Sequence, residues 1–168
     1  MFNIYEPLWA NNIAELARKS CAHLDVLAAE KEKLDREDAE GVLKAFGGQI
    51  VEDDVSKQPF FVKTSDEAFT VFLPKFSVRD ALCALGRVFV DFESIQEGEP
   101  VYIHERSSKG MTAHTFAMAF LMPKKLFATV VIKNSDSDIQ CNVDAVAETF
   151  GVSVNDAIAR GKELEIWS

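Results

Sequence analysis

The sequence predicts an α+β fold that is mostly helical and carries a small three-stranded sheet. Several segments repeat apolar residues at three- and four-residue steps, which is the pattern of an amphipathic helix. Three short segments rich in β-branched and aromatic residues lie between turn residues, as strands do. The chain has 168 residues, 48% of them hydrophobic and 27% charged. This composition is typical of one domain with an apolar core.

The first predicted element is a long amphipathic helix over residues 7–35. Pro7 suits its first turn. The apolar positions expected to form its stripe are Trp9, Ile13, Leu16, Leu24, Leu27 and Leu34. We expect this stripe to cover the core of the chain's own domain, and a homodimer through the helix is the alternative. The mixed-charge run 30–38 is expected to be a solvated helix end.

The middle of the chain combines a short helix with the predicted sheet. A helix over 37–46 should end at Gly47-Gly48. The expected strands are 49–53, 60–63 and 69–73, with turn signals between them. A buried helix over 76–92 then begins at Ser77, a suitable N-cap. Gly86, inside this helix, costs about 1 kcal/mol relative to alanine, so close packing of a neighbouring helix should explain it.

A polar loop and four helical segments complete the predicted chain. Residues 93–109 form the loop, with a short extended piece at 101–104. The expected helical segments that follow are 110–121, 124–132, 143–150 and 155–164, with a loop at 134–138.

Charge and composition narrow the function classes. The formal net charge is −9 and the pI about 4.8. Because affinity for nucleic acid comes mainly from Lys and Arg, no direct nucleic-acid binding is expected, whereas a basic protein surface would suit as partner. No apolar run reaches the roughly 20 residues that span a bilayer, and no secretory signal is visible. Three widely spaced cysteines fit free thiols in a cytoplasmic protein.

Segments 76–92 and 112–123 resemble the two metal-binding helices of the ImmA/IrrE-type zinc peptidases. That family carries a "TLAHELGH"-like helix and, downstream, an "E-x-E-A-N-x-F-A-x-x-L-L-M-P" helix. The second pattern is matched here by Phe116-Ala117 and Leu121-Met122-Pro123. The resemblance covers roughly residues 37–165 and implies a zincin-like fold. It divides the chain into an N-terminal helical extension, 1–36, and a degenerate peptidase domain, 37–168.

The resemblance also implies that the catalytic groups are lost. The His-Glu-Leu-Gly-His box of the family falls on residues 83–87, which places Cys83, Ala84 and Arg87 at its functional positions. The acidic positions of the second helix fall on Gly110 and Thr112. Alanine cannot move a proton, and the guanidinium of an arginine offers no lone pair to a cation. A pseudo-peptidase without catalytic residues or cofactor is therefore expected.

Two observations keep a metal site open as an alternative. Cys83 and His114, the latter at the asparagine position of the family's second helix, face each other by the resemblance. With Asp80 and His104 they could form an improvised site for a metallopeptidase with non-standard ligands. The simpler interpretation is that Cys83 is a small buried hydrophobe and His114 a hydrogen-bonded core or pocket histidine.

Arg87 is the most informative of the substituted positions. A buried arginine needs a carboxylate or several acceptors. Asp80, Asp91 or a loop glutamate would serve as a structural partner. The functional alternatives are that Arg87 fills the vacated metal site, holding the two helices together, or meets an acidic group of a binding partner.

The segment 146–160 resembles a helix-turn-helix. Asn155 and Arg160 are its candidate DNA contacts, but the acidic side chains Asp144, Glu148 and Asp156 surround them. DNA binding is thus the least favoured alternative.

The function predicted from the sequence is that of a non-catalytic, protein-binding regulator. By the resemblance, its partner would be a helix-turn-helix repressor of a phage or mobile element. The binding site is expected between the small sheet and the helix 76–92, where an edge strand could hold a peptide. The candidate binding residues are Arg87, His114, Glu93, Glu97 and Glu99.

Overall fold

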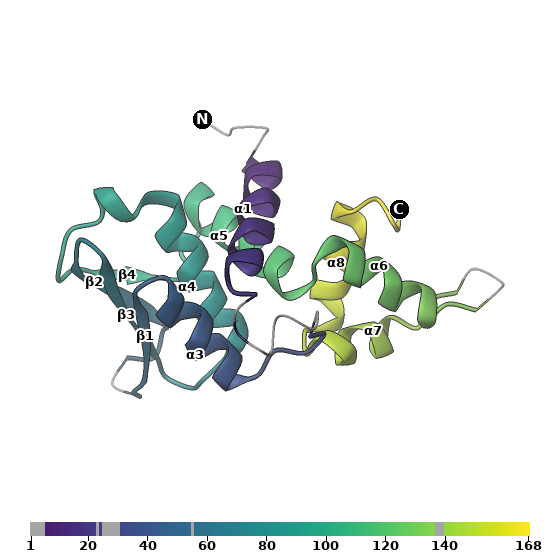
Figure 1. Ribbon diagram of the computed structural model, residues 1–168, viewed down its shortest axis with the longest axis horizontal. Coiled ribbons are helices and arrows are strands. Elements are labelled where there is room, and N and C mark those ends of the chain that lie inside the picture. Colours follow the sequence, from purple (N-terminus) through teal and green to yellow (C-terminus); the bar gives the residue numbers. More distant parts are fainter. Residues whose placement is uncertain (1–5, 23, 25–30, 55, 137–139) are drawn as a thin grey trace.

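The computed structural model describes residues 6–22, 24, 31–54, 56–136 and 140–168 (Figure 1). Within them the chain forms seven α-helices, one short 3-10 helix and a single mixed sheet of four strands. The predicted α+β class is confirmed. The predicted number of strands is wrong by one.

The sheet has the strand order β1-β3-β2-β4. Its strands are β1 (Gly48–Glu52), β2 (Phe60–Ser65), β3 (Ala68–Leu73) and β4 (Pro100–Tyr102). β1 is parallel to β3, and the other pairs are antiparallel. The missed strand is β4, which falls in the segment expected to be a loop with an extended piece. It has three residues, too few to show an alternating pattern of their own.

The two faces of the sheet differ in what covers them. One row of paired residues crosses all four strands and faces the helices: Ile50, Val71, Phe61 and Val101. Phe61 and Val71 in this row are fully buried. The neighbouring row points to the opposite face, because side chains alternate along a strand. It consists of Val51, Phe72, Phe60 and Tyr102, with the rings of Phe60 and Phe72 stacked at 4.9 Å.

Three capped helices build the centre of the molecule. They are α3 (Arg36–Ala45), α4 (Val78–Asp91) and α5 (Ser108–Leu121), and Asp35, Ser77 and Ser107 cap their N-termini. All residues of α4 from 81 to 88 are buried. α4 and α5 pack against each other at Gly86, where a Cβ would stand 2.8 Å from the carbonyl oxygen of Ala113. The close helix contact expected at Gly86 is confirmed.

The first helix is shorter than predicted and buries a different face. α1 (Glu6–Ser20) ends 15 residues before the predicted boundary at residue 35, and residues 31–35 lead without helical structure into α3. Leu27 lies outside the described residues. α1 packs on α5 through small side chains one helical turn apart: Ala10, Ala14, Ala17 and Cys21. Leu16 and Trp9, expected in the buried stripe, are 61% and 37% exposed.

The C-terminal part forms a group of three helices beside α1 and α5 (Figure 1). They are α6 (Lys124–Lys133), α7 (Val143–Phe150) and α8 (Val154–Glu163), close to the predicted ranges. Gly151 takes φ 68° between α7 and α8, a left-handed conformation that favours glycine. In the described part of the chain, no single helix is long and apolar enough to cross a bilayer. Only α5 and α6 together reach that length, and they are bent by 58°.

Candidate functional site

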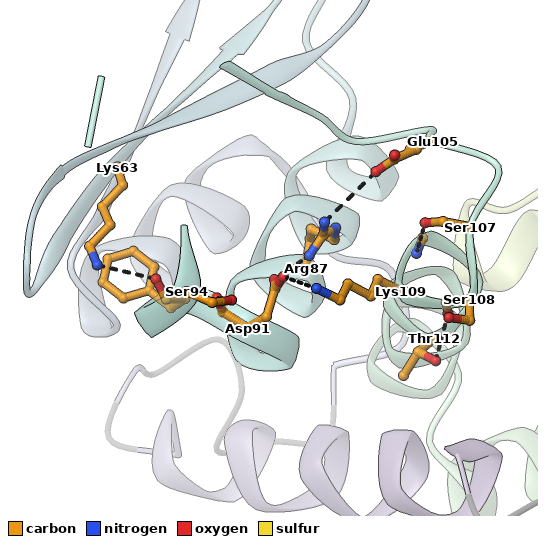
Figure 2. Close-up of polar contacts among 11 residues, drawn as sticks. Lys63, Arg87, Asp91, Ser94, Glu105, Ser107, Ser108, Lys109 and Thr112 are labelled. Atoms are coloured by element: carbon orange, nitrogen blue, oxygen red, sulfur yellow. Dashed lines mark hydrogen bonds and ion pairs between the residues drawn. The ribbon is translucent and has the colours of Figure 1, made fainter. Parts of the chain in front are cut away.

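Arg87 lies at the centre of a group of charged side chains from α4, α5 and the loop between them (Figure 2). Its side chain is 8% exposed, and its Nη1 donates to Asp91 Oδ1 one turn further along α4. The other carboxylate oxygen of Asp91 accepts from Lys109 Nζ at 2.6 Å. Of the three structural partners considered for Arg87, Asp91 is thus the one that binds it directly.

Two more groups complete the surroundings of Arg87. Its Nη2 lies 3.7 Å from Glu105 Oε2, on the loop before α5, so the two form an ion pair beyond hydrogen-bond distance. Its Nε is buried and has no hydrogen-bond partner among the described residues. Asp80, another of the considered partners, binds His104 Nε2 instead, at 2.7 Å.

A pocket of about 440 Å³ opens beside Arg87. It lies between the edge strand β4, the loop that follows it and α4. Its lining residues are Gln58, Arg87, Pro100, Val101, Tyr102, His104 and Glu105. Because β4 is the last strand of the sheet, the pocket borders an edge where another strand could pair.

Cys83 and Ala84, which by the resemblance share the family's box with Arg87, are both buried. Ala84 is fully buried, and Cys83 is 2% exposed. Burial raises the pKa of the Cys83 thiol to about 12, with the nearby Arg79 acting in the opposite direction. Since a thiolate is the form that attacks carbonyls and binds metals, Cys83 at neutral pH is a small core side chain.

The candidate ligand His114 belongs to a separate polar group. Its Nδ1 lies 3.4 Å from Nη2 of Arg79, and the same Nη2 lies 3.5 Å from Asp156. Burial is the largest cause that lowers the pKa of His114, and the charge of Arg79 lowers it further. His114 is therefore neutral at pH 7. Within the described residues, no three His, Cys, Asp or Glu side chains are grouped so that they could hold a metal.

The acidic positions of the family's second helix hold residues with structural tasks here. A Cβ on Gly110 would stand 2.1 Å from the backbone oxygen of Glu105, so this backbone has no room for a side chain there. Thr112 is buried, and its Oγ1 donates to the backbone oxygen of Ser108 at 2.9 Å (Figure 2). Neither residue carries a carboxylate, and an acidic side chain at Gly110 would require the backbone to move.

The acidic loop is not part of the Arg87 pocket. Glu93, Glu97 and Glu99 are exposed on the segment that leads to β4, and none of the three lines the pocket. These three residues precede β4 in the sequence, whereas Glu105 follows it.

The helix-turn-helix alternative loses one of its two candidate contacts. Arg160 is 3% exposed. Its guanidinium donates to the backbone oxygen of Met122 at 3.0 Å, to Asn11 Oδ1 at 2.6 Å and to Glu163 at 2.5 Å. Asn155 remains exposed. The proposal that Arg160 contacts phosphates is wrong, because this side chain joins α8 to α1 and to the end of α5.

Sequence reasoning expected a loop glutamate near Arg87 without saying that it is Glu105, and it missed Lys109, Tyr102 and Gln58. The pair Arg87–Asp91 could be read from its four-residue spacing on a helix. The other neighbours lie 15 or more positions from Arg87 in the sequence, and no periodic pattern connects them.

Comparison of the chain with protein-family models, with curated proteins and with solved structures finds no match. The zincin-like fold and the kinship with zinc peptidases thus stay predictions based on the residues of α4 and α5.

Proposed function

We propose that this chain is a non-catalytic, protein-binding regulator that holds an extended segment of its partner along the free edge of β4. The observation that carries the proposal is the pocket at that edge, whose lining includes Arg87 where the resemblance expects a metal-binding histidine. A permanently charged guanidinium repels a divalent cation.

The hydrogen-bonding pattern of β4 supports strand addition. The N–H of Ile103 donates to the backbone oxygen of Pro59 on the side of β2. In an antiparallel pair this direction alternates along the strand. Val101 therefore also points its backbone groups toward β2, and Tyr102 points its N–H and C=O toward the open edge. A partner strand would bond to these two groups and to the C=O of Pro100.

By the resemblance to the zinc peptidases, we propose a helix-turn-helix repressor of a phage or mobile element as the partner. The exposed Glu93, Glu97 and Glu99 and the net charge of −9 favour a basic protein surface around the bound segment. The partner is bound and left intact, because Ala84 and Cys83 provide neither a general base nor a nucleophile.

The test uses two substitutions of one residue. Tyr102→Pro removes the outward N–H at an edge position that tolerates proline, and Tyr102→Thr keeps that N–H while removing the ring. The three proteins are immobilised and exposed to extract of the native host, and captured proteins are identified by mass. We expect the wild type and Tyr102→Thr to capture one partner, and Tyr102→Pro to capture none. The captured partner should remain at full length after incubation with zinc.

Two results would contradict this function. Capture that Tyr102→Pro leaves unchanged would rule out pairing at β4. A partner recovered as defined fragments, in amounts that depend on added zinc, would favour the metallopeptidase alternative instead.

A further inference from the structure

We infer that the pocket beside β4 is a subsite for a carboxylate, in which Arg87 binds an aspartate or glutamate side chain of the partner segment in place of Glu105. This inference rests on the proposed function and adds to it the chemistry of the residue that is recognised. Three observations carry it: the unused edge of the Arg87 guanidinium, the charge balance around it, and the register of the sheet.

One edge of the Arg87 guanidinium makes no hydrogen bond within the described residues. Nη1 is engaged by Asp91. Nε is buried and has no hydrogen-bond partner in the described part of the chain, and Nη2 lies 3.7 Å from Glu105 Oε2. The N–H groups of Nε and Nη2 point in the same direction, and a carboxylate can accept both in two parallel hydrogen bonds. An incoming carboxylate would thereby satisfy a buried donor that is otherwise orphaned.

The charges around Arg87 favour an anion. Asp91, with a side chain 13% exposed, is shared by the two cations Arg87 and Lys109. Among the described residues, the further carboxylate paired with Arg87 is that of Glu105, whose side chain is 54% exposed. Arg87 is already removed from water in the unbound protein, so binding a carboxylate adds little to its desolvation cost. Glu105 can turn into solvent as the ligand enters.

The register of the sheet selects which partner residue enters the pocket. The row Ile50, Val71, Phe61 and Val101 faces the helices, and the next strand would lie about 4.8 Å beyond β4. The partner residue opposite Val101 would continue this row. Its side chain would therefore face the part of the pocket that Val101 and Arg87 line. Its neighbours in the added strand would point to the other face, one of them onto the ring of Tyr102.

The recognised segment is therefore an acidic residue preceded or followed by an apolar one, in extended conformation. β4 offers only three residues, so main-chain bonds alone give little affinity, and the side chain in the pocket must supply selectivity.

The experiment measures binding of three blocked peptides, Ser-Thr-Val-Xaa-Val-Thr-Ser, in which the central residue is Glu, Gln or Lys. We expect the Glu peptide to bind wild-type protein about tenfold or more tightly than the Gln peptide, as a hydrogen-bonded charge pair would give. Arg87→Gln should bring this ratio close to one. Glu105→Gln should tighten the Glu peptide several-fold and leave the Gln peptide unchanged, because the competing carboxylate is gone.

Glu99→Gln is the matched control, since it removes the same charge from an exposed residue that does not line the pocket. It should leave the ratio of the two affinities as in the wild type. Glu105→Gln keeps the test decisive if Arg87→Gln fails to fold, because the Glu105 side chain is exposed and its ion pair with Arg87 spans 3.7 Å.

A second measurement separates this inference from the proposed function. Acetate is titrated while the Nε–H resonance of Arg87 is followed by NMR. Equal affinity for the Glu and Gln peptides would overturn the carboxylate subsite and leave strand addition standing. If acetate shifts the Nε–H resonance of Arg87 but no peptide binds, the subsite is supported and strand addition is refuted. Absence of both effects would refute both.

Discussion

Gly86 of α4 lies against Ala113 of α5 so closely that a Cβ on Gly86 would stand 2.8 Å from the Ala113 carbonyl oxygen and 2.9 Å from the ring of Phe116. This contact fixes the distance between the two helices that carry Arg87, Asp91 and Lys109. Near this contact, Asp91 of α4 accepts from both Arg87 of α4 and Lys109 of α5.

Gly86→Ala should destabilise the protein by about 2 kcal/mol, because overpacking a close helix contact costs more than alanine gains in helix propensity. Gly41→Ala is the control. It lies within α3, and among the described residues its Cβ would meet only the two Cδ atoms of Leu24, at 3.4 and 3.9 Å. That substitution should be neutral or stabilising by up to about 1 kcal/mol. Urea denaturation of the three proteins measures the difference, and equal stability of both variants would contradict the close contact.

Stability should fall in alkaline solution because of Cys83. Burial raises the pKa of this thiol from 9.0 to about 12. From about pH 9 upward the unfolded chain loses the proton first, so the unfolded state binds fewer protons and the free energy of unfolding decreases with pH. Relative to Cys83→Ala, the wild type should lose about 1 kcal/mol per pH unit in that range.

Chemical denaturation of the wild type and of Cys83→Ala at several alkaline pH values tests this expectation. The second buried thiol, Cys21, also has a raised pKa through burial, and it is present in both proteins. The difference between them therefore isolates Cys83. Parallel pH profiles would mean that the thiol is exposed to solvent.

Zinc binding is a further test of the same residue. After dialysis, we expect well under one zinc per chain, unchanged by Cys83→Ala or by the control Cys141→Ala. The reason is that Cys83 is protonated and that Arg79 occupies the space beside His114. Elemental analysis of the purified proteins measures the metal. Stoichiometric zinc that only Cys83→Ala removes would restore the metallopeptidase alternative.

Arg160→Met should cost about 3 kcal/mol of stability, because it leaves Glu163 and the buried oxygen of Met122 without their partner. Lys162→Met, at an exposed neighbour on the same helix, should change stability by no more than about 0.5 kcal/mol. Denaturation midpoints give both values. A loss of DNA affinity in Arg160→Met without a loss of stability would instead favour the helix-turn-helix alternative.

Local features of the fold could be predicted well from the sequence. Ser77 begins α4 as expected, and Gly151 separates α7 from α8. The three longer strands lie within about two residues of their predicted ranges. Each of these depends on neighbouring residues only, through capping, turn conformation or a run of β-branched and aromatic side chains.

The errors arose where a partner distant in the sequence decides the structure. In α1, large apolar residues were expected inside, yet Ala10 and Ala14 are buried while Leu16 is exposed. Small side chains face α5 because they allow close packing, and an apolar period alone does not tell which of two faces is covered. Likewise β4 exists because β2 offers it a partner, as the pairing of Val101 with Phe61 shows.

By itself, the sequence determined the α+β class, most helix boundaries and the absence of a proton-moving side chain at Ala84, since these follow from residue type and local spacing. Only the tertiary structure decided what surrounds Arg87. Lys109, Glu105 and the edge of β4 reach it through the packing of α5 and the sheet against α4. Such contacts depend on how separate segments meet in space, and the guanidinium edge they leave unpaired is the basis of the function proposed for this chain.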